Sequence, residues 1–258
     1  MDYIVKPIGL GQIEADQSGF TYMAFPGVPL VLDVAYFIIK GASKNILVDT
    51  GSWAALMAKY WPGKGEDFQT FEESLQKEGM TPDDVDIIIT THLHHDHVGN
   101  HFKCKNAEVY VQLEEWAFAR SPHPLQAQYY PKDMMDQIGD MKLRLIRGDY
   151  ELFPGIRILY TPGHTPGTQS VCIDTKEGKT VIAGMCTIYQ TFEEPKKVLP
   201  EGHPFGQWEA FTQSIATDIN QAYWSCIQVK SMADVLLPCH GPGFSEQTKK
   251  YLPDSMRG

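Results

Sequence analysis

Short runs of apolar and β-branched residues, separated by turn-forming residues, dominate the pattern along the chain. In the first half this pattern predicts strands over residues 3–8, 31–39, 45–49, 85–90 and 108–112. In the second half it predicts strands over residues 143–146, 156–160, 169–174, 180–183 and 235–238. Wider apolar spacing predicts helices over residues 52–61, 68–78, 113–119 and 208–232, with an irregular excursion over 122–132.

Strands gather in each half of the chain, with helices between and outside them. Such an order is typical of an α/β protein in which two sheets pack face to face under outer helix layers. No internal repeat, low-complexity tract or Pro/Gly/Ser-rich linker divides the sequence. We therefore expect a single domain over residues 1–258.

Composition narrows the range of partners. The 22 basic residues are outnumbered by 32 acidic ones, and a net charge of -10 disfavours nucleic acid. The longest apolar run, residues 31–39, contains Asp33 and is far shorter than a membrane span, and the N-terminus lacks the pattern of a signal peptide. An odd number of cysteines without a CxxC pair argues against a disulfide framework and favours the cytoplasm. We therefore expect a small-molecule substrate, with no membrane partner.

The strongest chemical signal is the motif His92-x-His94-x-Asp96-His97, which follows a buried strand. It offers four first-row metal ligands within six residues. Imidazole and carboxylate donors suit zinc, iron or manganese. The sequence therefore predicts a metal site at this strand end.

Two further histidines stand in Gly-rich turns after predicted strands. His164 lies in the sequence TPGHTPG and His240 in PCHGPG. Each one alone is more typical of a hydrogen-bonded turn, but beside the first motif both become candidate ligands. We expect His95 to be exposed in the variable position of that motif. The lone histidines are expected to lie outside the site: His101, His123 and His203.

The order LVDTG (residues 47–51), HxHxDH, TPGHTPG and a C-terminal HGP turn resembles the metallo-β-lactamase superfamily over nearly the whole chain. Within it, the chain is most similar to the N-acyl homoserine lactone hydrolases. The resemblance implies a four-layer αββα sandwich with two metal ions, zinc foremost, at one edge. It implies one ion on His92, His94 and His164, and the other on Asp96, His97 and His240. Asp49 corresponds to a carboxylate that orients the ligands or the loop behind them, and the alternative of a turn residue at a strand end stays open.

The sequence departs from this family where a bridging aspartate is usual. Residues 183–189 read AGMCTIY, without a carboxylate. Aligning on Ala-Gly places Met185 at that position, whereas aligning on Tyr189 places Cys186 there. We favour Cys186, because a cysteine beside a metal becomes a thiolate and restores the missing anion, which a thioether cannot do. The alternative, a small buried residue on a core strand, stays open.

The resemblance implies a metal-dependent hydrolase that opens a lactone or related ester. A metal lowers the pKa of bound water to near 7, and the resulting hydroxide attacks the carbonyl. Asp96 would carry a proton to the ring-opened alkoxide, and Tyr189 would donate a hydrogen bond to the substrate unless it is a packing aromatic. Residues 20–26 and 122–130 offer either walls for an acyl chain or ordinary loop packing.

Three alternatives remain at this stage. They are hydrolysis of another ester, thioester or amide, mononuclear iron redox chemistry, and a metal-binding relative without turnover. The sequence leaves both a monomer and a symmetric homodimer open.

Overall fold

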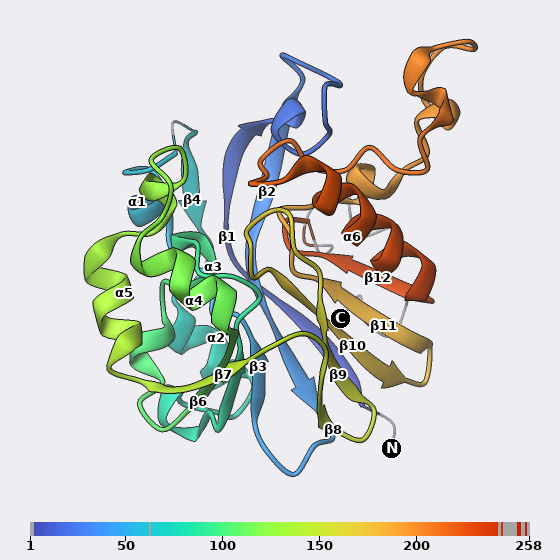
Figure 1. The fold of residues 1–258 in the computed structure, drawn as a ribbon. Helices are drawn as coiled ribbons and strands as arrows, with labels where there is room; N and C mark the ends of the chain where they lie inside the picture. Colours follow the sequence, from blue (N-terminus) through green and yellow to red (C-terminus); the bar gives the residue numbers. More distant parts are fainter. Residues whose placement is uncertain (1–2, 62, 242–243, 245–251, 254–255, 257–258) are drawn as a thin grey trace.

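Two β-sheets form the centre of the computed structural model, which describes residues 3–61, 63–241, 244, 252–253 and 256 (Figure 1). The first sheet has seven strands in the order β4-β1-β2-β3-β5-β6-β7. Its strands are β1 (Ile4–Asp16), β2 (Pro29–Lys40), β3 (Ile46–Val48), β4 (Gly65–Asp67), β5 (Ile87–Ile89), β6 (Glu108–Gln112) and β7 (Lys142–Ile146). The second sheet has five strands in the order β12-β11-β10-β9-β8. They are β8 (Tyr150–Phe153), β9 (Ile156–Tyr160), β10 (Gln169–Thr175), β11 (Gly178–Ala183) and β12 (Val235–Pro238).

The sheets pack through a shared apolar core built by the alternation of side chains along each strand. In β10, Val171 and Ile173 join the core between the sheets, whereas Cys172 packs in a cluster on the outer face. In β3, Val48 faces the inter-sheet core and Leu47 the opposite cluster. Strands that are buried on both faces read as continuous apolar runs, as in the IIIT segment of residues 87–90.

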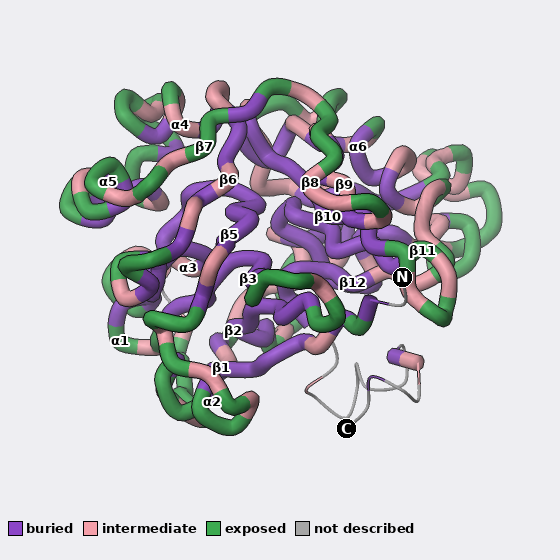
Figure 2. The backbone as a smooth tube through the Cα atoms, turned by 90° about the horizontal axis from the view of Figure 1, so that it is seen from below, coloured by how far each residue is buried: buried purple, intermediate pink, exposed green. Residues whose placement is uncertain are grey.

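Helices cover the outer face of each sheet. They are α1 (Ala54–Met57), α2 (Phe71–Lys77), α3 (His95–Val98), α4 (Leu113–Arg120), α5 (Lys132–Gly139) and α6 (Ile219–Met232). Phe71 and Leu75 of α2 pack on the first sheet, and Cys226 and Val229 of α6 pack on the second. Figure 2 shows buried backbone along the strands and exposed segments over the outer helices and turns. The predicted four-layer αββα sandwich is confirmed.

Several element boundaries differ from the sequence predictions. The helix predicted over residues 208–232 begins only at Ile219, because the Asp218 carboxylate caps it by accepting hydrogen bonds from the N–H groups of Asn220 and Gln221 at 2.9 and 3.0 Å. The helix predicted over residues 52–61 shrinks to α1. Strands β4 and β8 and helices α3 and α5 were not predicted. In the part of the chain that the structure describes, no helix combines the length and apolarity needed to cross a bilayer.

The strand directions bring the chemically active loops to one edge. Strands β3 and β5 are parallel, as are β11 and β12, and β9 and β11 both run antiparallel to β10. The carboxyl ends of β3 and β5 therefore share an edge of the first sheet, and those of β9, β11 and β12 share an edge of the second, and the residues that follow them meet at one edge of the sandwich. Five candidate residues follow them: Asp49 after β3, His92 after β5, His164 after β9, Cys186 after β11 and His240 after β12.

Candidate metal centre

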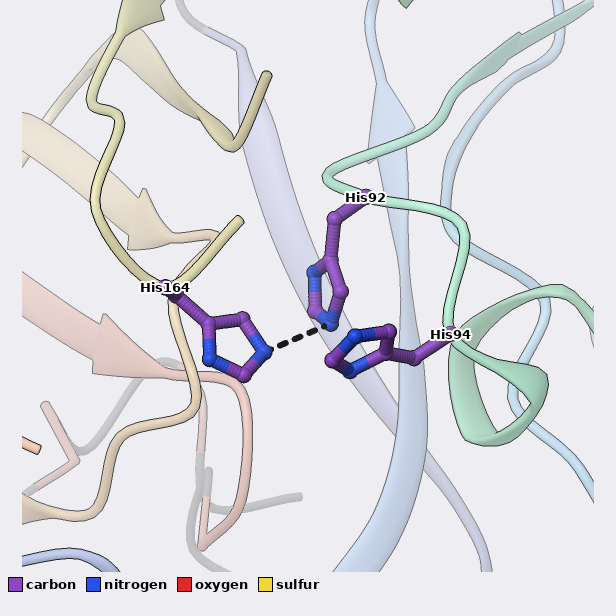
Figure 3. A group of neighbouring side chains, drawn as sticks. All are labelled: His92, His94 and His164. Carbon is purple, nitrogen blue, oxygen red and sulfur yellow. Dashed lines mark hydrogen bonds between the residues drawn. The ribbon is translucent and has the colours of Figure 1, made fainter. Parts of the chain in front are cut away.

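Three histidines from two distant loops converge at this edge, and we call them the three-histidine group: His92, His94 and His164 (Figure 3). All three side chains are buried. One ligand atom from each lies within 4.8 Å of the others, and the Nε2 atoms of His92 and His164 are 3.2 Å apart. The structure thus brings together the three residues expected to hold the first ion.

Hydrogen bonding and burial prepare this group to bind a cation. The Nδ1 atom of His164 donates to the Ile215 carbonyl oxygen at 2.6 Å, which leaves the Nε2 lone pair facing the group. Burial lowers the pKa of His164 to about 4, and it lowers the pKa values of His92 and His94 well below 6.5. All three imidazoles are therefore neutral near pH 7 and can act as ligands.

The second candidate set, which we call the aspartate group, consists of Asp96, His97 and His240. The Oδ2 atom of Asp96 lies 3.4 Å from Nε2 of His97 and 3.5 Å from Nε2 of His240. Burial opposes charge on His97, but the carboxylates of Asp96 and Asp49 raise its pKa above 6.5. Burial also opposes ionisation of Asp96, yet the surrounding histidines, His97 foremost, lower its pKa. In this group the surroundings therefore favour the charged forms of Asp96 and His97, whereas in the first group burial favours neutral imidazoles.

Asp49 supports the aspartate group from behind. Its Oδ2 atom accepts a hydrogen bond from Nδ1 of His97 at 2.7 Å, and its two oxygens accept from the N–H and hydroxyl of Thr91, also at 2.7 Å. Asp49 holds this position with a left-handed φ of 60°, a strained backbone conformation that clusters at functional sites. The contact expected for Asp49 is present, and it directs the free Nε2 of His97 toward Asp96.

Asp49, His97 and Cys239 also lie close enough to form a third group of possible ligand atoms. The Cys239 thiol donates to the Ala183 carbonyl oxygen at 2.8 Å, and Asp49 already binds His97 and Thr91. These atoms are satisfied by the protein itself, so we assign the third group to support of His97.

The orphaned atoms of the site fit a bound cation. Nε2 of His94 and Nε2 of His97 are buried and have no hydrogen-bond partner. Buried polar atoms are normally paired, so two unpaired imidazole nitrogens in adjacent ligand groups are the signature of metal donors. The donor set of five imidazoles and one carboxylate suits zinc, iron or manganese.

The segment without the bridging aspartate places its two candidates in different surroundings. Met185 is fully buried in the outer apolar cluster, where its sulfur lies 3.7 Å from Sγ of Cys226. Cys186 instead lines the cavity beside the ligand groups, together with Asp96 and His240. Burial, and then the charge of Asp96, raises the pKa of Cys186 well above 9.0. Cys186 belongs to none of the three ligand groups found among the described residues.

The cavity at the site is narrow, with a volume of about 40 Å³. Its wall is formed by Ile13, Phe20, Leu32, Met57, Trp61, His94, His95, Asp96, Tyr129, His164, Cys186, Ile215 and His240. The space suits ions and water. Both loop segments considered as walls contribute a residue, Phe20 and Tyr129. Tyr189 is buried in the turn after Cys186 and is not part of this described lining.

Of the remaining histidines, His95 lies in the cavity wall, His101 in the core, and His123 and His203 nearer the surface. The expectation that His95 is exposed is wrong: it is 3% exposed, because its ring packs against Tyr60 with centroids 4.7 Å apart. His101 is buried between the hydroxyls of Thr50 and Thr90 at 2.8 and 2.7 Å, and burial lowers its pKa to about 3. His123 and His203 lie in none of the described ligand groups.

Sequence reasoning missed two residues that touch the ligand segments, Thr91 and Glu115. Thr91 stands directly before His92, and its hydroxyl lies 2.7 Å from Asp49 and 3.1 Å from Nδ1 of His92. Its position next to the motif was an available signal. Glu115 is fully buried and binds Leu93 and Thr165, but no local pattern distinguishes it from the neighbouring Glu114.

Comparison with known proteins agrees with this geometry. Residues 30–213 match the model of the metallo-beta-lactamase superfamily. An N-acyl homoserine lactonase from Bacillus thuringiensis is 31% identical over 200 residues, covering 72% of this chain and 77% of the relative. A crystal structure of AiiA from B. thuringiensis, a mutant with N-decanoyl-L-homoserine bound at the active site, matches with a TM-score of 0.76 at 25% identity, covering 98% of both chains.

A second solved structure is described as an N-acyl homoserine lactone hydrolase with the product N-hexanoyl-L-homoserine bound at the catalytic metal center. It matches with a TM-score of 0.75 at 25% identity and also covers 98% of both chains. The family model spans more than half of this chain, and the resemblance drawn from the motifs is confirmed. The chain belongs to the metallo-beta-lactamase superfamily.

Proposed function

We propose that this protein is a zinc-dependent lactonase that opens an N-acyl homoserine lactone to the N-acyl homoserine. The observation that carries the proposal is the adjacency of two complementary ligand groups beside one cavity. The solved structures described above supply the substrate class, because ring-opened homoserines are bound in them. The proposal therefore joins the chemistry of this site to the chemistry named for its relatives.

The ligand assignment follows the two groups. His92, His94 and His164 would hold one ion, and Asp96, His97 and His240 the other. Divalent ions at these positions supply a nucleophile at neutral pH and polarise the substrate carbonyl. Zinc suits this imidazole-rich set, and iron or manganese are the alternatives for the metal analysis.

The chain's own residues have separate tasks in ring opening. Water adds its oxygen to the lactone carbonyl carbon, the ring C–O bond breaks, and the alkoxide takes a proton. Asp96, which lines the cavity, is placed to take the proton of the water and return it to the leaving oxygen. We propose Tyr189 as a hydrogen-bond donor to the substrate, a role that requires its hydroxyl to turn into the cavity. Phe20 and Tyr129 contact the acyl part and exclude water.

Cys186 is proposed as the anionic ligand at the position where relatives carry the bridging aspartate. Its place in the cavity wall supports this assignment, whereas Met185 packs in the core. The buried thiol holds its proton in the absence of a cation, because burial and Asp96 raise its pKa. Two divalent charges favour the thiolate, as in other metal-coordinated thiols.

The cysteines and the proposed substrate bear on the cellular location and the partners of the enzyme. All five cysteines are free, which supports placement in a reducing cytoplasm. A small-molecule substrate suffices for the chemistry, and neither nucleic acid nor a membrane is required. We leave a homodimer as a proposal to be tested by light scattering.

Lactone opening has a direct test. Zinc-loaded protein is mixed with N-hexanoyl-L-homoserine lactone in a pH-stat, and the product is analysed by mass spectrometry in water enriched in oxygen-18. We expect base consumption equal to product, one heavy oxygen in the new carboxylate and no oxygen uptake. Oxygen consumption that matches turnover, or an unlabelled product, overturns the hydrolytic proposal, and a panel of thioesters and amides tests the other hydrolase chemistries.

The ligand role of Cys186 has a spectroscopic test. Cobalt-loaded protein should show a thiolate-to-metal charge-transfer band that disappears in Cys186→Ala, together with loss of metal from the aspartate group. Cys186→Asp should keep two ions, because it restores an anionic ligand. Cys226→Ala removes another buried thiol, from the outer cluster, and serves as the control. An absent band together with full metal content in Cys186→Ala assigns Cys186 to the core.

A further inference from the structure

A buried carboxylate on α4 lies outside every ligand group described above. Glu115 has no exposed surface. One of its oxygens accepts hydrogen bonds from the Leu93 N–H at 2.9 Å and the Tyr130 hydroxyl at 3.0 Å. The other accepts from the Thr165 hydroxyl and from the Gly167 N–H at 3.3 Å. Burial of a carboxylate is costly unless it is hydrogen-bonded, and these four donors offset that cost while they tie Glu115 to the segments they come from.

The four donors come from the segments that carry or cover the three-histidine group. Leu93 lies between His92 and His94, while Thr165 and Gly167 follow His164 in the TPGHTPG turn. The ring of Tyr130 packs edge-on against His94, with centroids 4.9 Å apart. Glu115 therefore connects both segments that supply this group and an aromatic ring that contacts it.

Gly167 shows how closely α4 must approach the turn. A Cβ atom at this position would lie 2.2 Å from the Glu115 nitrogen and 2.4 Å from its Cβ. These distances are too short for any side chain, so only glycine allows the contact. The second glycine of the TPGHTPG motif thus makes room for the helix that carries Glu115.

We propose that Glu115 is a positioning residue that holds the His92–His94 segment and the His164 turn in register and thereby sets the metal affinity of the three-histidine group. This inference rests on the proposed metal site. Within the part of the chain that the structure describes, Glu115 bonds to Leu93, Tyr130, Thr165 and Gly167 and not to the aspartate group, where Asp49 supports His97. Its effect should therefore be selective for one group.

The chemistry of the donors requires a carboxylate at this position. The Leu93 and Gly167 N–H groups can only donate, and they contact different oxygens of Glu115. A glutamine would turn an N–H group toward one of them and leave two donors facing each other. Burial raises the pKa of Glu115, and the hydrogen bonds from Thr165, Leu93, Tyr130 and Gly167 oppose that rise.

The test separates the two ligand groups by mutation. Glu115→Gln is made in a His240→Ala background, which leaves the three-histidine group, and in a His164→Ala background, which leaves the aspartate group. Zinc affinity is measured by competition with a chromophoric chelator. We expect a loss of roughly 10- to 100-fold in the first background, in line with the cost of removing an outer hydrogen-bond partner of a metal site, and less than about 3-fold in the second.

Two further variants complete the design. Glu114→Gln changes the adjacent carboxylate, which pairs with Arg147 at the surface, and should leave both affinities unchanged. Glu115→Asp retains the charge and should recover part of the affinity. The cobalt absorption spectrum in the His240→Ala background should shift with Glu115→Gln, which a uniform loss of stability would not cause. If Glu115→Gln does not fold, Thr165→Val is used instead, because it removes one of the four donors to Glu115. It should also lower the zinc affinity of the three-histidine group selectively, but by a smaller factor.

The outcomes distinguish this inference from the proposed function. Unchanged zinc affinity in the His240→Ala background, or an equal loss in both backgrounds, overturns the positioning role of Glu115. Absence of zinc binding by the unmutated protein overturns the metal site itself. A selective loss with partial recovery in Glu115→Asp supports the inference.

Discussion

The three-histidine group and the aspartate group lie beside the same cavity, yet they prepare for a cation in different ways. In the first, burial keeps three imidazoles neutral, with the pKa of His164 lowered to about 4. In the second, His97 lies between two carboxylates that raise its pKa, and Asp96 is held as an anion. The first group therefore offers free lone pairs, whereas in the second a cation competes with the proton that the two carboxylates favour on His97.

This difference shows that similar ligands can be tuned by what lies behind them. His164 is oriented by a neutral main-chain carbonyl, and His97 by the Asp49 carboxylate. A carboxylate partner makes an imidazole a stronger base, which strengthens metal binding but also proton binding. We expect the two groups to fill with different pH dependence and to respond separately to mutation.

Removal of a ligand should have the largest effect. His164→Ala and His240→Ala should each lose one ion, and lactone hydrolysis should fall by more than about 100-fold, because a direct ligand matters more than the outer partners of a site. Metal analysis after gel filtration and initial rates measure both quantities. His203→Ala, outside the described ligand groups, is the control. Two retained ions in both variants would contradict the assignment of the groups.

Loss of the carboxylate behind His97 should come next. Asp49→Ala removes the acceptor of His97 Nδ1 and of both Thr91 donors. We expect zinc affinity of the aspartate group to fall roughly 10- to 100-fold, as for other outer partners of metal ligands, with little change in the three-histidine group. Chelator competition in the single-group backgrounds measures this, and the exposed Asp83→Ala is the control. Equal losses in both groups would show that Asp49 supports the whole edge.

Proton release on zinc binding should differ between the two groups, and it can be measured with Asp49 and Glu115 left in place. Because the carboxylates of Asp96 and Asp49 raise the pKa of His97 above 6.5, whereas burial lowers the pKa values of the three-histidine group, zinc binding at pH 6.5 should release more protons from the aspartate group than from the three-histidine group. Below the pKa of His97, the zinc affinity of the aspartate group should therefore fall about tenfold for each unit of decreasing pH. Calorimetry of His164→Ala and His240→Ala in buffers of different ionisation enthalpy counts the protons. Equal release by both variants would refute the comparison.

The sequence could predict the ligands of both groups, but not the packing that surrounds them. The metal ligands could be predicted because histidine and aspartate are concentrated in short sequence motifs. Each motif follows a predicted strand, and the ends of these strands meet at one edge of the sandwich. The alternatives at residues 185 and 186 needed the three-dimensional structure, because only packing shows Met185 in the outer cluster and Cys186 in the cavity wall. Likewise, the exposure expected for His95 was wrong because Tyr60, 35 positions earlier in the sequence, covers its ring.

Residues that act through distant partners were beyond sequence reasoning. Glu115 binds a strand end 22 positions before it and a turn 50 positions after it. Nothing in the local pattern separates it from Glu114, which pairs with a surface arginine. The start of α6 shows a similar limit, because apolar spacing continued through residues 208–218 and the cap at Asp218 was overlooked. Short motifs identify the residues that can bind a metal, whereas the residues that position those ligands can be found only in the folded structure.

The smallest expected effect comes from Thr91, where the two groups meet. Its hydroxyl lies 2.7 Å from Asp49 and 3.1 Å from Nδ1 of His92. It can therefore donate a hydrogen bond to Asp49, behind the aspartate group, and accept one from His92 of the three-histidine group. Thr91→Val keeps the shape of the side chain and should weaken zinc binding by each group about fivefold, equivalent to the roughly 1 kcal/mol of one hydrogen bond. Thr90→Val is the matched control, because the Thr90 hydroxyl contacts His101 at 2.7 Å instead. Chelator competition in the single-group backgrounds gives both affinities. A change confined to one group would mean that the hydroxyl serves that group alone and that the two halves of the site are independent.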